Sequence, residues 1–269
     1  MAVPYKAPVK DIVFGYEVID SYNVLNKISA FSDFSEDIVI PTMEECAKFS
    51  EEVLAPINAI GDQQGATIKD GVVTMPEEFV DAYKKFAEAG WASISLPSDI
   101  GGGGMPITLS GGTLEILSTA NLAFGLAPGL SAGAISAINF HGSQEQKDKF
   151  LPKLVSGEWT GTMNLSEPQS GSDLGTITTK AEPQEDGSYK ITGTKVWITF
   201  GEHNMTENII HLVLAKVPGS PEGTKGISMF IVPKYTVNDD GSVGDSNNVS
   251  CISIEEKLGI HASPTCVME

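Results

Sequence analysis

The hydrophobic periodicity of the chain changes near its middle, and this change constrains the fold more than any other feature of the sequence. Before it, apolar residues recur every three to four positions over 37–55 and 76–89, which predicts amphipathic helices. The segments 113–120 and 130–140 are apolar nearly all round, as buried helices are. After it, short runs rich in β-branched and aromatic residues predict strands at 159–165, 177–181, 189–197, 209–217, 227–232 and 249–254. The sequence therefore predicts an α+β protein, with an N-terminal all-α domain in residues 1–156 and a small antiparallel β-barrel or sandwich in residues 157–269.

Residues typical of helix ends refine these boundaries. Pro41 falls where a first-turn proline is tolerated, and Pro56 is expected to end the same helix. Ser143 followed by Gln146 resembles a capping box, which predicts a helix from there through about residue 150.

The charge balance limits the kinds of partner. Acidic residues outnumber basic ones by 35 to 17, a formal net charge of −18. This charge argues against nucleic acid and against an anionic membrane, because binding to either needs clustered cations. No run approaches the roughly 18 apolar residues of a membrane-spanning helix, and Met1–Pro8 lacks the charged-then-apolar pattern of a signal sequence. Cys46, Cys251 and Cys266 lack metal-ligand spacing, so we expect reduced, buried thiols in a cytoplasmic protein without a metal site.

Several segments resemble ligand sites without completing the pattern. Gly101–Gly104 lacks the Gly-Lys-Ser/Thr end of a phosphate loop, and we interpret it as a flexible connection between helices. The acidic run 238–245 fails the spacing of a calcium loop and is expected to be a solvated hairpin tip. The histidines at 141, 203, 211 and 261 are scattered, and we expect each to be structural or exposed.

One region carries a more specific pattern. Residues 163–173 read Met-Asn-Leu-Ser-Glu-Pro-Gln-Ser-Gly-Ser-Asp, an apolar strand followed by a turn, and residues 195–201 read Lys-Val-Trp-Ile-Thr-Phe-Gly. On a strand, Trp197 and Thr199 point to the same face, so an indole and a hydroxyl would stand side by side. By itself, this arrangement also fits a core tryptophan on a half-buried strand.

Together these segments resemble the acyl-CoA dehydrogenase family, whose flavin-binding signature joins a Thr/Ser-Glu-Pro-x-x-Gly-Ser-Asp stretch to a Lys-x-Trp-Ile-Thr strand. Gly142–Pro152 looks like the helix before the family's barrel, Pro97–Gly102 like its Pro-x-x-x-Gly-Gly loop, and Lys257–Thr265 like its Lys-x-Gly-x-x-x-Ser-Pro-Thr segment. The resemblance covers about residue 77 to the end. The opening Tyr5–Asp11 looks like the larger, N-terminally extended bacterial branch, in which some members act on short or sulfur-containing acyl-CoA thioesters.

The resemblance implies non-covalently bound FAD and oxidation of an acyl-CoA thioester to the trans-2-enoyl-CoA. A carboxylate would take the α-proton while the β-hydrogen leaves as hydride to flavin N5. The residues implied to contact FAD are Met163 and Leu165 through backbone and packing, Ser166 at the pyrimidine side, Trp197 over one ring face, Ile198 beside it, Thr199 near N5, and Gly171 and Ser172 near the phosphate. Ser172 would also contact the pantetheine arm of the substrate, whereas Glu167 and Asp173 are interpreted as turn residues.

In this family the catalytic glutamate lies in a C-terminal helical bundle, which also forms most oligomer contacts. The sequence ends at Glu269 in an apolar strand-like run, which we interpret as a truncation before that bundle. We therefore assign no catalytic residue and expect this chain alone to bind FAD weakly and to turn over no substrate. The resemblance implies a homo-oligomer that passes electrons to an electron-transfer flavoprotein or a similar acceptor.

Three alternatives remain open. An acyl-CoA oxidase shares the scaffold and passes electrons to O₂. A flavin-free acyl-CoA-binding or assembly protein could keep the barrel, although Ser166, Trp197 and Thr199 argue against it. A plain β-rich binding module is disfavoured by the long apolar helices within 113–140, which would cover one face of the barrel.

Overall fold

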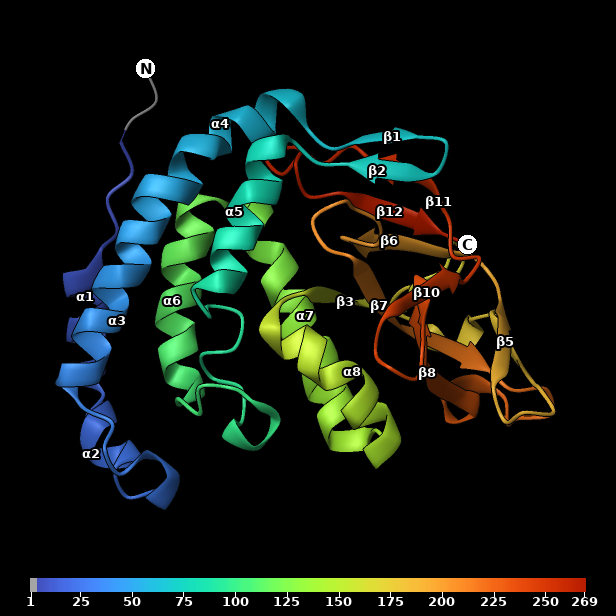
Figure 1. The fold of residues 1–269 in the computed structure, drawn as a ribbon, viewed down its shortest axis with the longest axis horizontal. Helices are drawn as coiled ribbons and strands as arrows, with labels where there is room; N and C mark the ends of the chain where they lie inside the picture. Colours follow the sequence, from blue (N-terminus) through green and yellow to red (C-terminus); the bar gives the residue numbers. More distant parts are fainter. Residues whose placement is uncertain (1–3) are drawn as a thin grey trace.

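The computed structural model describes residues 4–269, so Met1–Val3, part of the segment tested for a signal sequence, lie outside it. Figure 1 shows a helical part on the left and a strand-rich part on the right, which confirms the α+β class. The helices are α1 (Val9–Val18), α2 (Ser21–Leu25), α3 (Glu36–Phe49), α4 (Ala55–Gln64), α5 (Glu77–Glu88), α6 (Ile107–Ala120), α7 (Leu122–His141) and α8 (Gln144–Ser156). The strands are β1 (Thr67–Lys69), β2 (Val72–Thr74), β3 (Trp159–Asn164), β4 (Lys180–Pro183), β5 (Tyr189–Thr192), β6 (Lys195–Thr199), β7 (Asn208–Lys216), β8 (Ile227–Pro233), β9 (Tyr235–Val237), β10 (Val243–Ser246), β11 (Cys251–Glu255) and β12 (Thr265–Met268).

The prolines of the first long helical segment behave differently from the sequence prediction. Pro41 lies inside α3, beyond its first turn. Pro56 does not end the helical path, because a π-helical turn over Ser50–Leu54 leads directly into α4. Pro56 then occupies the first turn of α4. The predicted capping box is confirmed: Ser143 Oγ accepts from Gln146 N, and Gln146 Oε1 accepts from Ser143 N.

Helix α7 joins the two parts of the molecule. It packs against α6, α8 and β3, and its N-terminus is capped by Asn121, whose side chain accepts from Phe124 N and donates to Leu54 O. By length and composition alone α7 could cross a membrane, although the sequence shows no uninterrupted run of roughly 18 apolar residues there. Within this structure 44% of its apolar stretch is buried, and a core helix passes the same test.

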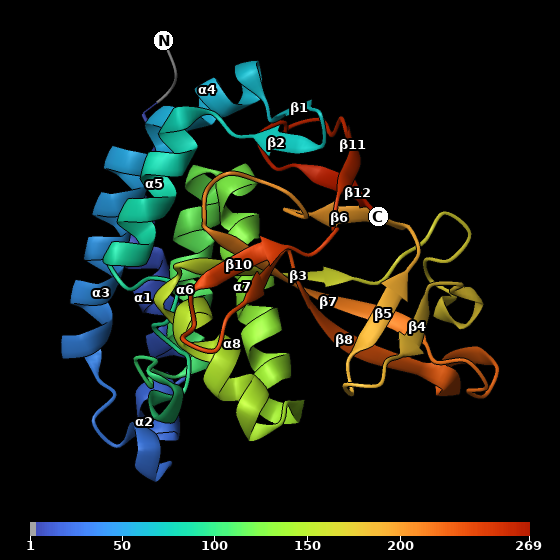
Figure 2. The same ribbon diagram turned by 45° about the vertical axis from the view of Figure 1, so that its right-hand side comes forward.

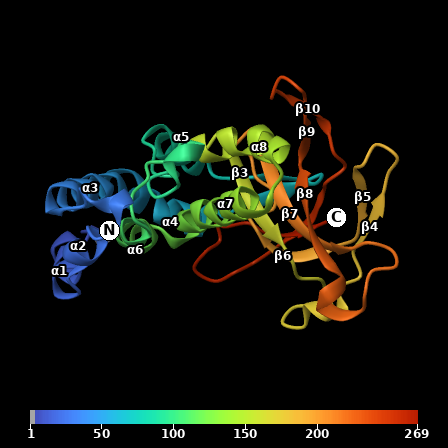
Figure 3. The ribbon, with the colours of Figure 1, turned by 90° about the horizontal axis from the view of Figure 1, so that it is seen from below.

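The strands of the β part form one mixed sheet and one antiparallel sheet. The sheet order is β3-β7-β4-β5, with β8 on β7, and a second sheet has the order β11-β12-β6. Most pairings are antiparallel as predicted, but β3 and β4 each pair with β7 in parallel. A parallel pair needs a long crossover, and the 165–207 segment between β3 and β7 supplies one. Figure 3 shows the β9–β10 hairpin projecting from this part, with the acidic run at its tip as predicted.

A β-hairpin within the helical half departs from the all-α expectation. Strands β1 and β2 pair across Asp70-Gly71, both in the left-handed region at φ 50° and 81°. Figure 2 shows this hairpin lying beside β11, and Val73 is buried with Cys251 and Cys266. The hairpin therefore extends the core of the β part, and its Asp-Gly turn was the available sequence signal.

Candidate functional site

The turn after β3 is closed by its own backbone. Glu167 N donates to Ser170 O over 2.7 Å, and Ser170 N donates back to Glu167 O over 2.9 Å. Asp173 Oδ1 accepts from Gly175 N and begins a short 3₁₀ turn. Glu167 thus organises the turn through its backbone and Asp173 through its side chain, in agreement with the interpretation of both as turn residues.

The Glu167 carboxylate is buried and accepts six hydrogen bonds. Its donors are Gln169 Nε2, the backbone N and Oγ1 of Thr178, the backbone N and Oγ1 of Thr179, and Lys195 Nζ at 2.9 Å. Burial alone would raise the pKa of Glu167, but the bonds from Thr179, Thr178 and Lys195 outweigh it and hold the pKa well below the ordinary range. Burial lowers the pKa of Lys195, and the carboxylate opposes that shift. The Glu167 carboxylate is therefore ionised near neutral pH, with Lys195 Nζ among its donors.

Strand β6 presents Trp197 to solvent through an irregular backbone. Its register against β12 shifts between Cys266 and Met268, because β6 carries one residue more than its partner. Trp197 lies in this bulge at φ 60°, a conformation that costs a residue with a Cβ roughly 1–2 kcal/mol. Its indole is 54% exposed, whereas Ile198 beside it is buried. The alternative of a core tryptophan at this position is therefore wrong, and the core indole of this region is Trp159.

A backbone hydrogen bond joins the two segments that the sequence singled out. Val196 N donates to Ser166 O over 2.9 Å, which places the Ser166 turn against the start of β6. Ser166 and Thr199 are half-buried, and Gly171, Ser172 and Trp197 are exposed. We call Ser166, Gly171, Ser172, Trp197 and Thr199 the candidate surface.

The remaining predicted positions lie differently. Ile198 packs in a core with Val73, Cys251 and Met268, so only its backbone can reach a ligand. Met163 packs partly against the core between α7 and the sheet, and Leu165 is half-buried, with its carbonyl accepting from Lys195 Nζ.

The candidate surface fits a flat, partly polar ligand such as FAD. An exposed indole offers one face for stacking, and the neighbouring Ser166 and Thr199 offer hydroxyls. A Cβ at Gly171 would meet no atom within 4 Å, so open space surrounds this turn and a ligand can approach its backbone.

A cavity of about 1130 Å³ lies elsewhere in the β part. Strands β5 and β8, helix α7 and the terminal Glu269 contribute to its walls, along with the inner side chains Asn164 and Lys195. No residue of the candidate surface lines it. We assign the functional site to the candidate surface because Trp197 is exposed on β6 and the Ser166 turn is hydrogen-bonded to the start of that strand.

The other sequence features have structural roles. His203 Nε2 bonds Thr160 Oγ1 and its Nδ1 accepts from Met205 N, while burial lowers the pKa of His203 to about 3. The cysteines are free and buried, as predicted. Across residues 4–269 no group of three or more His, Cys, Asp or Glu side chains could hold a metal.

The glycine loop 101–104 is a tightly packed turn and not a flexible connection. A Cβ at Gly102 would lie 2.2 Å from Leu96 O, and one at Gly103 would lie 2.6 Å from Ile94 O. The loop therefore needs glycine because other backbone fills the space.

The sequence did not identify the Glu167–Lys195 pair as part of this site. Lys195 is the first residue of the segment 195–201. The one indication in the sequence was a charged residue at the start of a strand whose Val196 and Ile198 side chains are buried.

A helical part followed by a mixed β part with an exposed stacking indole defines a class of two-domain proteins suited to a planar cofactor. Residues 41–158 match the acyl-CoA dehydrogenase N-terminal domain, and residues 162–269 match the acyl-CoA dehydrogenase middle domain. The chain belongs to the acyl-CoA dehydrogenase family, which confirms the resemblance found in the sequence, and its matched residues correspond to the family's N-terminal and middle domains.

Individual relatives agree with this assignment. The chain is 45% identical over 98% of its length to 3-methylmercaptopropionyl-CoA dehydrogenase of Ruegeria pomeroyi, and 39% identical over 97% to a butyryl-CoA dehydrogenase of Syntrophomonas wolfei. It spans 45% and 43% of those two proteins, less than half of each. Among solved structures, the Bacillus anthracis acyl-CoA dehydrogenase complexed with FAD has a TM-score of 0.68 at 27% identity, over 88% of this chain and 36% of that one.

Proposed function

We propose that this chain is the N-terminal and middle part of an FAD-dependent acyl-CoA dehydrogenase, which oxidises an acyl-CoA thioester to the trans-2-enoyl-CoA. The observation that carries the proposal is the indole of Trp197, 54% exposed at a strained backbone and joined to the Ser166 turn. A protein seldom keeps such strain without a use for it. The FAD-bound relative of the same fold supports the choice of cofactor.

The residues of the candidate surface would divide the work of holding the ring. Trp197 would cover one face, Ser166 would hydrogen-bond the polar pyrimidine edge, and Thr199 would lie near the reacting edge. Gly171 and Ser172 let the phosphate and the pantetheine arm approach the exposed turn. When bound, FAD supplies the acceptor for the hydride that leaves the β-carbon.

The base that takes the α-proton is not assigned to any residue of this chain. Glu167 and Asp173 are engaged within the turn, and Glu167 is ionised behind six donors. We propose that the base, and the oligomer contacts, come from the part of the protein that corresponds to the uncovered half of the relatives.

The relatives favour a short or sulfur-containing acyl chain. The two bacterial proteins named above act, by their names, on 3-methylmercaptopropionyl-CoA and butyryl-CoA. Their identities of 45% and 39% also support the N-terminally extended bacterial branch. A chain in a solved structure of the electron transferring flavoprotein of Acidaminococcus fermentans matches this fold (TM-score 0.69, 26% identity, covering 88% of this chain and 55% of that one). We propose an electron-transfer flavoprotein as the acceptor, as the resemblance to the family implies. The free, buried thiols suit the cytoplasmic setting proposed from the sequence.

Anaerobic titration tests the proposal. The full-length protein should be yellow as purified, and 3-methylmercaptopropionyl-CoA or butyryl-CoA should bleach the flavin absorbance. A colourless protein that cannot be loaded with FAD would refute the proposal and favour the flavin-free binding protein. Rapid H₂O₂ formation during turnover in air would instead identify an acyl-CoA oxidase.

A further inference from the structure

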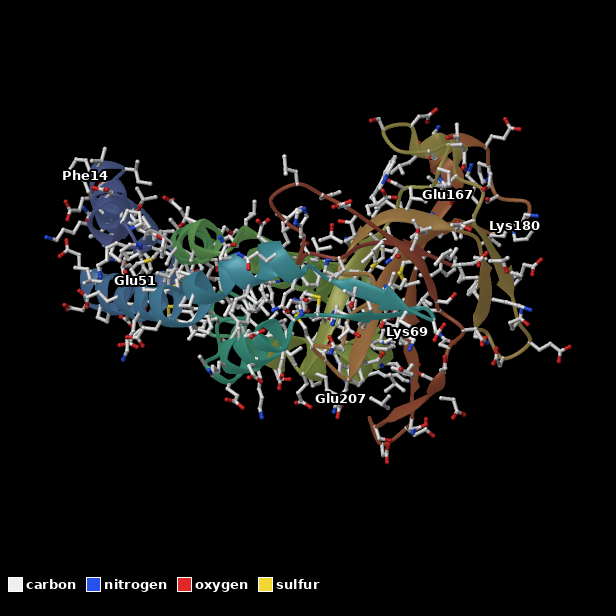
Figure 4. All side chains as sticks on the ribbon, turned by 90° about the horizontal axis from the view of Figure 1, so that it is seen from above. Phe14, Glu51, Lys69, Glu167, Lys180 and Glu207 are labelled. Atoms are coloured by element: carbon white, nitrogen blue, oxygen red, sulfur yellow. The ribbon has the colours of Figure 1, made fainter. Side chains whose placement is uncertain are left out.

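A buried ion pair lies in the two segments that carry Ser166 and Trp197 of the candidate surface. Lys195 and Glu167 have side-chain exposures of only 4% and 2%, and Nζ lies 2.9 Å from Oε1. Figure 4 labels Glu167 in the β part of the molecule, where the turn after β3 meets β6. A charge pair so deeply buried is costly to desolvate, so it persists only where its remaining hydrogen bonds are satisfied.

The pair ties three chain segments together. Glu167 follows Ser166 in the turn, Thr178 and Thr179 precede β4, and Lys195 begins β6 two residues before Trp197. The ion pair therefore holds the Ser166 turn beside β6 together with the backbone bond from Val196 N to Ser166 O. Neither side chain belongs to the candidate surface itself.

The ammonium also acts on the backbone of the candidate surface. Lys195 Nζ donates to Leu165 O over 3.0 Å. That carbonyl belongs to the peptide unit whose N–H is on Ser166, and a charged donor on the carbonyl polarises the unit. Ser166 N–H is thereby a stronger donor toward any negative charge that develops in front of it.

We propose that Glu167 and Lys195 are positioning residues for the flavin: together they fix the Ser166–Trp197 spacing, and their balanced charges set the reduction potential of the ring. This inference rests on the proposed function. A purely structural role would not distinguish the two partners by the sign of their charge, whereas this inference does. Removing one or the other should move the potential in opposite directions.

The test is the flavin midpoint potential of the full-length, FAD-loaded protein. Glu167→Gln leaves the Lys195 charge unbalanced and should raise the potential, since a positive charge favours reduced, anionic flavin. Lys195→Met leaves the carboxylate, still held by five uncharged donors, and should lower it. The double variant should return toward the wild-type potential, although all three variants should bind FAD about tenfold more weakly through loss of positioning.

Exposed charges of the same region provide matched controls. Lys180→Met and Glu182→Gln remove one charge of each sign from exposed positions of β4, where solvent screens them, and should leave the potential unchanged. If Glu167→Gln does not fold, the midpoint potentials of Lys195→Arg and Lys195→Met are compared instead. Only the methionine variant loses the positive charge, so only its potential should fall. Shifts of the same sign in Glu167→Gln and Lys195→Met, or no shift, would overturn the inference. Failure of the wild-type protein to bind FAD would instead overturn the proposed function.

Discussion

The strained backbone at Trp197 leads to a prediction that reverses the usual order of two substitutions. In an ordinary strand, glycine is less stable than alanine by about 0.5–1 kcal/mol, because its unfolded chain is more flexible. At φ 60° alanine carries a Cβ penalty of about 1–2 kcal/mol that glycine avoids. Trp197→Gly should therefore be more stable than Trp197→Ala by about 0.7 kcal/mol, the difference between the midpoints of those two ranges.

Both substitutions remove the same indole, so the loss of its contacts cancels in the comparison. The assay is urea unfolding of the full-length apoprotein followed by circular dichroism. The difference in the free energy of unfolding is taken from the two midpoints, with the same dependence on urea concentration (m value) for both variants. Tyr189 is the matched control: it is a 45% exposed aromatic on β5 outside the left-handed region. There alanine should be the more stable variant. Equal or greater stability of Trp197→Ala would refute the reasoning that the site stores backbone strain.

Three further predictions concern the scaffold. Gly61→Ala should lower the free energy of unfolding by about 1–3 kcal/mol in the same urea assay, because its Cβ would lie 2.5 Å from the Phe79 ring. A Cβ at Gly111 would meet no atom within 4 Å, so Gly111→Ala should stabilise α6 by about 0.5–1 kcal/mol. Ser143→Ala should lower the melting temperature through loss of about 1 kcal/mol of capping at α8, and an unchanged melting temperature would show that the cap is dispensable. Burial lowers the pKa of His203 from 6.5 to about 3, so unfolding takes up a proton at this residue between pH 6.5 and about 3. As the pH falls through this range, His203 should lower the free energy of unfolding by about 1.4 kcal/mol per pH unit, and His203→Gln should make that slope shallower by the same amount.

Much of the fold could be predicted from the sequence, because the patterns that indicate it lie within short stretches of the chain. The change from helical to alternating periodicity predicted the α+β class, and the Ser143–Gln146 capping box needed only four consecutive residues. The residues of the flavin signature were also contiguous, and the bond from Val196 N to Ser166 O shows that their two segments meet.

What the sequence did not predict depends on partners far apart in the chain. The bulge at Trp197 arises from register with β12, about 70 residues later, and no local pattern specifies a left-handed tryptophan. The pairing of Lys195 with Glu167 likewise joins β6 to the turn after β3, a strand of the other sheet. The parallel pairing of β3 with β7 followed from a crossover that strand periodicity cannot show. The β1–β2 hairpin is different, because its Asp70-Gly71 turn was present in the sequence and was overlooked.

The account rests on the candidate surface being the place where the flavin ring binds, and a crystal structure of the FAD-loaded full-length protein tests this most directly. The ring should stack on the Trp197 indole, with Ser166 within hydrogen-bonding distance of its polar edge. A ring bound in the cavity between β5 and β8, with Trp197 left in solvent, would contradict the account.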